Sequence, residues 1–192
     1  MPELYIIAGC NGAGKTTASY TILPKIFNCK EFVNADEIAK GLSPFRPEKV
    51  AIQAGRIMLQ RISQLISENE SFAIETTLST LSYRNTIKTA QLAGYHVSLI
   101  FFWLNDVNLA LQRVEARVAE GGHNIPEETV RRRYRKGLIN LIQIFINITD
   151  KWIIVDNSKQ KFSLIARGDK GNGPLVYDDK KWNLIKMASN EN

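Results

Sequence analysis

The chain has 192 residues, of which 44% are hydrophobic and 23% are charged, and its formal net charge is +6. This length suits one domain, residues 1–192, and the composition is that of a globular chain rather than a disordered or fibrous one. A basic balance of this size fits an anionic partner, which can be a nucleic acid or a small phosphorylated molecule.

The sequence contains no feature that predicts membrane insertion or secretion. The first residues lead directly into an apolar run without the pattern of a signal peptide. The longest apolar run, residues 97–104, is far too short to span a bilayer. Cys10 and Cys29 have neither a metal-binding spacing nor the number expected of a disulfide framework. We therefore expect a cytoplasmic protein without membrane contact.

Short apolar runs alternate with longer segments of helical period along the chain. Five of these runs predict buried strands, at residues 4–8, 31–33, 72–74, 97–104 and 152–155. The segments between them predict crossover helices, at residues 15–27, 47–69, 82–94, 107–121 and 126–148. Two last runs, 162–166 and 175–177, flank a glycine-rich turn and predict a C-terminal hairpin over about 162–177. This alternation predicts an α/β protein with a mostly parallel five-stranded sheet.

The segment between the first strand and the first helix matches the phosphate-binding pattern G-x-x-x-x-G-K-[ST] in full. Its residues are Gly9, Cys10, Asn11, Gly12, Ala13, Gly14, Lys15 and Thr16. Small residues let backbone N–H groups surround the β- and γ-phosphates, and the helix that follows presents its positive end. Lys15 can reach the phosphate oxygens, the Thr16 hydroxyl can join the shell of Mg²⁺, and Thr17 adds to the nucleotide site. The sequence thus predicts a three-layer P-loop NTPase fold that binds ATP or GTP with Mg²⁺.

Acidic and hydroxyl side chains follow the second and third predicted strands. Ligands gather at the carboxyl ends of parallel strands, so Asp36 is expected to face the phosphate loop and to accept a proton from an attacking hydroxyl. Glu75 is expected to organise Mg²⁺ through water or to bind the acceptor, and Thr77 to bind the acceptor. A purely structural alternative makes Asn34 and Glu37 a capping box, with Asp36 in the first turn of a helix.

An arginine-rich segment over about 113–135 predicts a lid. Arg113 and Arg117 are four residues apart and share one face of a helix. A hinge follows at Gly121 and Gly122, and His123 and Arg132 are further candidates for substrate contact. Arginine suits this role because its guanidinium is always charged and grips oxygens in pairs. The remaining cations are interpreted as a solvated helix face: Arg131, Arg133, Arg135 and Lys136.

Other P-loop classes fit the sequence less well. A GTPase would carry a base-reading N-K-x-D motif, which this sequence lacks, and a transport ATPase would need a longer chain with a signature loop. The acidic residues after the strands favour a kinase.

The chain resembles the zeta-toxin family of P-loop kinases from Leu4 to about Ser158. The phosphate loop alone is shared by many families, but three further motifs make the resemblance more specific. They are N-A-D-E at Asn34–Glu37, I-E-T-T-L at Ile74–Leu78 and R-V-E at Arg113–Glu115. Within the family the chain looks most like a bacterial branch often labelled as predicted ABC-type ATPases.

Zeta toxins phosphorylate the 3′-hydroxyl of the amino sugar in UDP-N-acetylglucosamine and are held in check by a small helical antitoxin. The resemblance implies that Asp36 is the general base and that Lys15 is the phosphate lysine. It further implies that Glu75 and Thr77 touch the acceptor and that Arg113 is a lid arginine.

Two departures from the family pattern concern the acceptor. The toxins carry E-G-T-x-R, whereas this chain has Ser79 at the arginine position, with Arg84 as a possible replacement. A second toxin arginine before the lid proline corresponds to His123 here. The acceptor therefore stays open between a UDP-sugar and another small molecule.

Two alternatives remain at the level of the sequence. One is a kinase of another acceptor, such as a nucleoside, an antibiotic or a nucleic-acid end. Nucleic acid is disfavoured because the aromatic residues fall on strand and apolar-stripe positions rather than along a basic groove. The other alternative is a non-catalytic nucleotide-binding switch.

Overall fold

A computed structural model describes residues 1–122, 124–159 and 161–190 of the chain. Seven strands form one sheet in the order β2-β3-β1-β4-β5-β6-β7. Five of them run parallel: β1 Glu3–Gly9, β2 Glu31–Val33, β3 Phe72–Thr76, β4 His96–Trp103 and β5 Lys151–Asp156. The last two, β6 Ser163–Asp169 and β7 Leu175–Val176, run antiparallel to their neighbours.

The prediction of five strands was too low by two, although the predicted C-terminal hairpin exists. β6 pairs with β5 in antiparallel register, with an irregularity between Ile154 and Val155, so the hairpin extends the main sheet. The backbone groups along the free edge of β5 require hydrogen-bond partners, and the hairpin supplies them. The two outer strands are short, because β2 has three residues and β7 has two.

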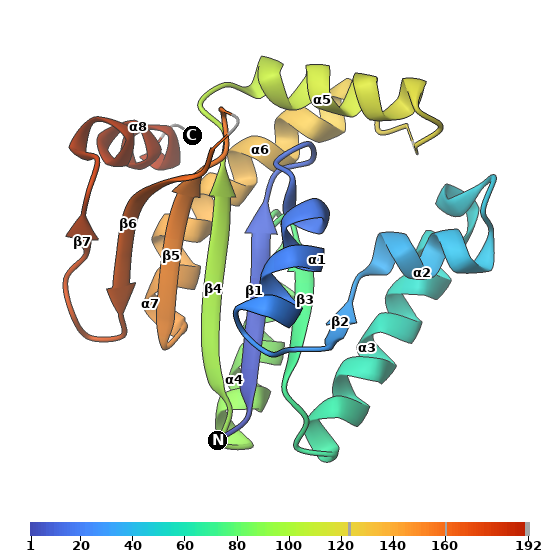
Figure 1. Ribbon diagram of the computed structural model, residues 1–192, viewed down its shortest axis with the longest axis horizontal. Helices are drawn as coiled ribbons and strands as arrows, with labels where there is room; N and C mark the ends of the chain where they lie inside the picture. Colours follow the sequence, from blue (N-terminus) through green and yellow to red (C-terminus); the bar gives the residue numbers. More distant parts are fainter. Residues whose placement is uncertain (123, 160, 191–192) are drawn as a thin grey trace.

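Helices cover the sheet on both faces, as the predicted three-layer architecture requires (Figure 1). Their bounds are α1 Lys15–Lys25, α2 Ala35–Leu42, the 3-10 turn η1 Pro47–Val50, α3 Ala51–Ser67, α4 Tyr83–Leu92, α5 Val107–Ala119, α6 Glu127–Asn140, the π-helical turn η2 Leu141–Phe145, α7 Ile146–Ile148 and α8 Asp179–Asn190. α1 lies in front of β1, α4 and α6 lie behind the sheet, and α5 crosses above the carboxyl ends of the strands (Figure 1).

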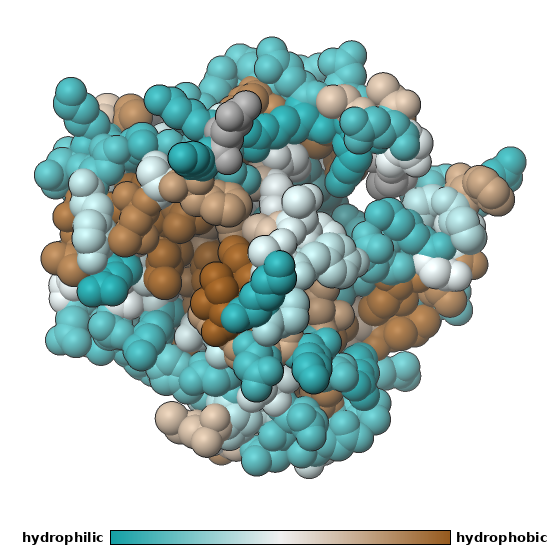
Figure 2. All heavy atoms as spheres, in the orientation of Figure 1, coloured by the Kyte–Doolittle hydropathy of each residue, from teal (hydrophilic) through white to brown (hydrophobic). Residues whose placement is uncertain are grey.

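The long apolar run of β4 is explained by burial on both faces. Leu99 and Phe101 pack into the core behind the sheet, whereas Ile100 and Phe102 pack into the core in front of it. Parallel strands with both faces covered read as continuous apolar runs. No helix of the described residues covers the front of β5 and β6, and an apolar patch shows on that side of the molecule (Figure 2).

α8 was not predicted from the sequence. Trp182 and Ile185 are buried on its inner face, and the Trp182 ring stacks on Trp152 of β5 with centroids 5.9 Å apart. The spacing of these residues is helical, but the segment follows a turn-rich stretch that masks the pattern. Over the described part of the chain, no helix is both long and apolar enough to cross a membrane.

Candidate nucleotide and phosphoryl-transfer site

The phosphate loop connects β1 to α1 and is shaped by glycine. Gly12 and Gly14 have φ angles of 77° and 80°, in the left-handed region that side chains disfavour. A Cβ atom on Gly12 would lie 2.7 Å from the Ala110 carbonyl oxygen, and one on Gly14 would lie 2.6 Å from Asn157 Nδ2. Both positions therefore favour glycine for conformation, and Gly12 requires it for packing as well, because the atom that its Cβ would meet belongs to the backbone.

Glu75, at the end of β3, is the centre of a polar cluster beside this loop. Its Oε2 accepts hydrogen bonds from the Thr16 hydroxyl at 2.8 Å and from Asn34 Nδ2 at 2.9 Å. Its Oε1 lies 3.5 Å from Lys15 Nζ, which also donates to the Cys10 carbonyl oxygen at 3.0 Å. The predicted strand-end residues thus meet because β1, β2 and β3 are parallel and end at one edge of the sheet.

The Thr16 hydroxyl and the Glu75 carboxylate are oxygen ligands of the kind that Mg²⁺ prefers. Mg²⁺ in phosphoryl-transfer sites takes one or two protein oxygens and completes its shell with phosphate and water. The two side chains converge within hydrogen-bond distance, so they fit this donor set.

Cys10 lies inside the loop but is not a reactive thiol. It is buried, and this burial raises its pKa to about 11. The positive charges of Lys15 and Arg113 lower the pKa, but the effect of burial is larger. The thiol is therefore protonated near neutral pH and fills space beneath the loop.

The loop forms one wall of a cleft of about 920 Å³. The opposite walls come from α2, η1 and the far end of α5. The cleft is lined by Asn11, Gly12, Gly14, Lys15, Thr16, Thr17, Tyr20, Ala35, Asp36, Glu37, Ala39, Lys40, Pro47, Glu48, Ala51, Glu75, Arg113, Ala116, Arg117, Glu120, Gly121 and Gly122. Figure 2 shows the surface hollowed between the end of α5 and α2, at the upper right.

Asp36 is the second residue of α2 and lines this cleft. Asn34 caps the helix by accepting from the backbone N–H groups of Asp36 at 2.8 Å and Glu37 at 3.4 Å. Glu37 pairs instead with Lys40 at 2.7 Å. No hydrogen bond or ion pair ties the Asp36 carboxylate to another described residue, so the capping role does not account for it.

The predicted lid arginines have different positions. Arg113 reaches back to the loop, where its guanidinium donates to the carbonyl oxygens of Gly12 at 3.5 Å and Ser158 at 3.3 Å. Arg117 lines the cleft one helical turn later, beside the Gly121–Gly122 hinge. Arg132 is exposed on α6 and lies outside the cleft lining. His123 falls outside the described residues.

The predicted acceptor residues Thr77 and Arg84 also lie in different places. The Thr77 hydroxyl shares a hydrogen bond of 2.9 Å with the Ser79 hydroxyl, in the loop between β3 and α4. Arg84 is exposed on α4 and is not among the residues that line the cleft. Ser79 and Thr77 are likewise absent from this lining, so the replacement of the family arginine by Arg84 stays a prediction.

Two residues that contact the phosphate loop were not predicted from the sequence. Asn157, just after β5, donates from Nδ2 to the Ala13 carbonyl oxygen at 2.7 Å and thereby holds the loop. Arg133 donates from Nη1 to Asn11 Oδ1 at 3.3 Å, although its segment was interpreted as a solvated face. Both had a signal in the sequence. Asn157 follows a predicted strand end, and Arg133 borders the apolar stripe through Val130 and Tyr134.

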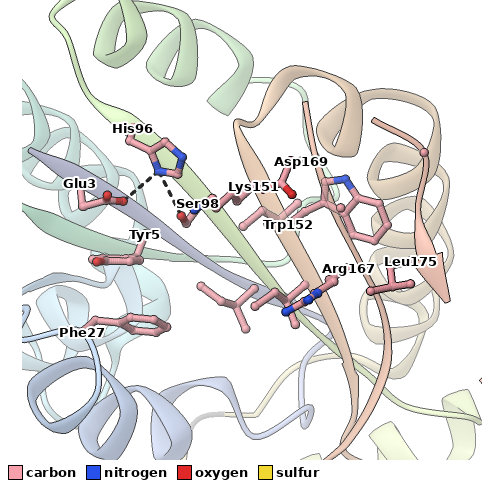
Figure 3. Close-up of a pocket in the computed structure, with 15 residues that line it drawn as sticks. Glu3, Tyr5, Phe27, His96, Ser98, Lys151, Trp152, Arg167, Asp169 and Leu175 are labelled. Carbon is pink, nitrogen blue, oxygen red and sulfur yellow. Dashed lines mark hydrogen bonds and ion pairs between the residues drawn. The ribbon is translucent and has the colours of Figure 1, made fainter. Parts of the chain in front are cut away.

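A second hollow of about 530 Å³ lies away from the phosphate loop. Figure 3 shows it between the amino ends of β1 and β4 and the front of β5 and β6. His96 pairs there with Glu3 at 3.1 Å, and Tyr5 stacks on Phe27. Ligands of parallel sheets bind at the carboxyl ends of the strands, so the candidate nucleotide site is the cleft at the phosphate loop rather than this hollow.

Comparison with known proteins agrees with this geometry. The family model described as Zeta toxin matches residues 1–170. A protein of Haemophilus influenzae, described as uncharacterized, is 35% identical over 129 residues, which are 66% of this chain and 88% of that protein.

Solved structures share the fold over most of this chain. The complex of AvrRxo1-ORF1 and AvrRxo1-ORF2 with sulphate ions matches with a TM-score of 0.81 and 17% identity, over 100% of this chain and 65% of that chain. This chain therefore spans less than two thirds of that protein's length. The PezAT toxin–antitoxin system of Streptococcus pneumoniae matches with a TM-score of 0.67 and 16% identity, over 99% of this chain and 86% of that chain. Because the family model spans nearly the whole chain, the chain belongs to the zeta-toxin family.

Proposed function

We propose that this kinase transfers the γ-phosphoryl group of ATP to a hydroxyl group of a small molecule, with Asp36 as the general base. The observation that carries the proposal is the Asp36 carboxylate, which lines the same cleft as the phosphate loop and has no bonded partner among the described residues. A carboxylate in this position can accept a proton from a hydroxyl that attacks the γ-phosphorus.

In the proposed reaction the acceptor oxygen forms a new bond to the γ-phosphorus. The bond from this phosphorus to the bridging oxygen of the β-phosphate breaks, ADP leaves, and the acceptor proton moves to Asp36. Backbone N–H groups of the loop and Lys15 hold the phosphates. Arg113 and Arg117 face the same space and offset the negative charge that the transferring group carries.

Mg²⁺ is the metal that the oxygen donors suit, and Thr16 and Glu75 would hold it. When bound, it neutralises phosphate charge. Glu75 has a second role that needs no metal, because it fixes Lys15, Thr16 and Asn34 in one cluster. A structure of the AvrRxo1 pair with ATP shares the fold of this chain, with a TM-score of 0.78, which is in keeping with ATP as the donor.

For the acceptor we propose a hydroxyl-bearing small molecule, with UDP-N-acetylglucosamine as the first compound to test. Family membership favours the UDP-sugar, and Thr77 is available beside the strand end. Ser79 weakens this choice, because it stands at the position where the toxins carry an arginine. A small helical antitoxin, expected from the resemblance, stays a prediction.

The test offers γ-phosphate-labelled ATP and a metabolite extract that contains UDP-N-acetylglucosamine to the wild type and to Asp36→Asn. We expect transfer of label by the wild type and a loss of about 100-fold or more in Asp36→Asn, since the variant cannot take the proton. ATP affinity should stay within about threefold, because Asp36 makes no contact with the phosphate loop. Glu37→Gln, at the neighbouring position, is the matched control.

Each result has one interpretation. Label in a UDP-sugar identifies the acceptor as this sugar. Label in another compound identifies that compound as the acceptor instead. Equal transfer by the wild type and Asp36→Asn would remove Asp36 from the mechanism. ATP binding without transfer by either protein, in any extract, would indicate a nucleotide-binding switch instead of a kinase reaction.

A further inference from the structure

One face of α6 points toward the reaction site rather than toward solvent. Arg133, Gly137 and Asn140 are four and three residues apart, so they share a face. Arg133 contacts Asn11 of the phosphate loop, and Asn140 Nδ2 donates to the Leu78 carbonyl oxygen at 2.6 Å. A Cβ atom on Gly137 would lie only 2.7 Å from the Thr77 carbonyl oxygen, so the helix backbone packs directly against that loop.

The loop that this face contacts is held in an unusual conformation. Leu78 is fully buried and has a φ angle of 53°, which is rare for a residue with a branched side chain. Its N–H donates to the Thr76 hydroxyl at 3.0 Å, while its carbonyl oxygen accepts from Asn140. α6 therefore fixes the phosphate loop at one end and the Thr77 loop at the other.

Arg133 is a partly buried cation whose charge is not neutralised by an ion pair. Within the described residues no carboxylate pairs with it, and its hydrogen-bond partner Asn11 is a neutral amide. Burial lowers the pKa of Arg133 and the neighbouring Arg132 adds to this, whereas the negative charge of Asp36 raises it. The guanidinium remains charged at any physiological pH.

The negative charge of Asp36 is thus felt at Arg133, although no hydrogen bond or ion pair joins the two among the described residues. A charge withdrawn from water without a partner is costly, and proteins keep such a group where a ligand supplies the opposite charge. Arg133 reaches the phosphate loop at Asn11, and Asn11 lines the same cleft as Asp36. A phosphoryl group passing from ATP toward a hydroxyl held by Asp36 would move through this cleft, next to Asn11.

We propose that Arg133 is a catalytic residue that contacts the transferring phosphoryl group from the side of α6, next to Asn11. This inference rests on the proposed kinase reaction and adds a cation to those of the lid. The two N–H groups of its fork would bind oxygens of the γ-phosphoryl group as its bond to ADP breaks and the bond to the acceptor oxygen forms. Asn11 orients the guanidinium.

The test needs no knowledge of the acceptor. Aluminium fluoride with ADP and Mg²⁺ imitates the transferring phosphoryl group, so a competent kinase binds ADP more tightly when the fluoride is present. The affinity for ADP is measured with and without aluminium fluoride for the wild type, Arg133→Gln, Arg133→Lys and Lys136→Gln. Lys136 is exposed on the same helix, and its replacement by glutamine removes the same charge.

We expect Arg133→Gln to keep its ADP affinity within about threefold and to lose about 100-fold of the tightening caused by aluminium fluoride. Arg133→Lys should recover part of the effect, since it keeps the charge but not the fork, and Lys136→Gln should match the wild type. Melting temperatures measured in parallel show whether each variant is folded.

Three outcomes would overturn the assignment. Full tightening in Arg133→Gln would show that the guanidinium does not meet the phosphoryl group. An equal loss of plain ADP affinity would show that Arg133 only supports the loop through Asn11. Absence of tightening in the wild type would instead contradict the kinase reaction itself, and the role of Arg133 would fall with it.

Discussion

Gly12 shows how one residue couples the phosphate loop to the helix above it. Its backbone adopts φ 77°, and its missing side chain lets α5 approach so closely that a Cβ atom would lie 3.2 Å from Arg113 Cβ. The loop shape that exposes N–H groups to a phosphate and the position of the lid arginine thus depend on the same glycine.

We therefore expect Gly12→Ala to lower ATP affinity at least about tenfold, because the added methyl group would collide with the Ala110 carbonyl and strain φ. Gly55→Ala is the control, since Gly55 lies in α3 and an added methyl group there would meet no other atom within 4 Å. That change should leave ATP affinity unaltered and stabilise the fold by about 0.5–1 kcal/mol. Calorimetric titration with ATP and thermal melting measure both effects, and unchanged affinity in Gly12→Ala would contradict the packing argument.

At this scale the sequence predicted the phosphate loop well, because the motif and its local strand–helix context determine its structure together. It placed Arg133 of α6 wrongly, on a solvated helix face. Successive residues on a helix point about 100° apart, so Arg132 is exposed while Arg133 meets Asn11. The sequence distinguishes Arg132 from Arg133 only by their angular position relative to the apolar stripe of α6, and both residues lie next to this stripe.

α8 is attached to the sheet by stacked tryptophans and by a buried charge. Asp156, at the end of β5, is 4% exposed and pairs with Lys181 Nζ at 3.0 Å. Burial by itself raises the pKa of Asp156, but hydrogen bonds from Ser158 and Lys181 outweigh it and hold the pKa below its usual value. The ionised carboxylate therefore stabilises the folded chain.

Lys181→Met should lower the free energy of unfolding by about 1–2 kcal/mol near neutral pH, because it leaves Asp156 without its cation. The pKa of Asp156 is lower in the folded chain than in the unfolded chain, where it is about 4. The ionised carboxylate therefore stabilises the fold above about pH 4, and this stabilisation is lost as the pH falls through the lower pKa of the folded chain. The difference between variant and wild type should shrink below about pH 4. Urea unfolding followed by tryptophan fluorescence at several pH values tests this, with the exposed Lys180→Met as the control that should behave like the wild type.

Elements were predicted best where their apolar pattern is strong. The strand positions were correct because strands buried on both faces are continuous apolar runs, and the helix after Pro126 was correct because its apolar period is clear. In α3 the buried residues are Ala54, Met58, Ile62 and Leu65, while Arg61 pairs with Glu31 at 2.7 Å on the surface. The pairing of β6 with β5 was not predicted, because no local sequence pattern specifies whether the C-terminal hairpin joins the edge of the main sheet.

Over the whole molecule, the cleft is bounded by parts of the chain that are far apart in sequence. Its lining includes Asp36 on α2, Glu48 on η1 and Gly121 after α5, which face one another across the hollow. The predicted lid is thus a shared boundary, formed by the end of α5 on one side and by α2 with η1 on the other.

We expect ATP with Mg²⁺ to slow amide hydrogen exchange in the segments around 9–17, 47–51 and 116–122, since a nucleotide would contact both sides of the cleft. Exchange in β6 and β7, which lie outside the cleft, should not change and serves as the internal control. Protection confined to the phosphate loop would show that α5 and η1 take no part in enclosing the nucleotide.

The two outermost strands have a consequence for how copies of this protein behave when crowded together. β2 offers three residues and β7 offers two, so neither border of the sheet presents a row of unpaired amides long enough to recruit a strand from a neighbouring molecule. Fibrous growth by strand addition is therefore disfavoured from the folded state. Association at high concentration would have to proceed through side chains instead of through the backbone.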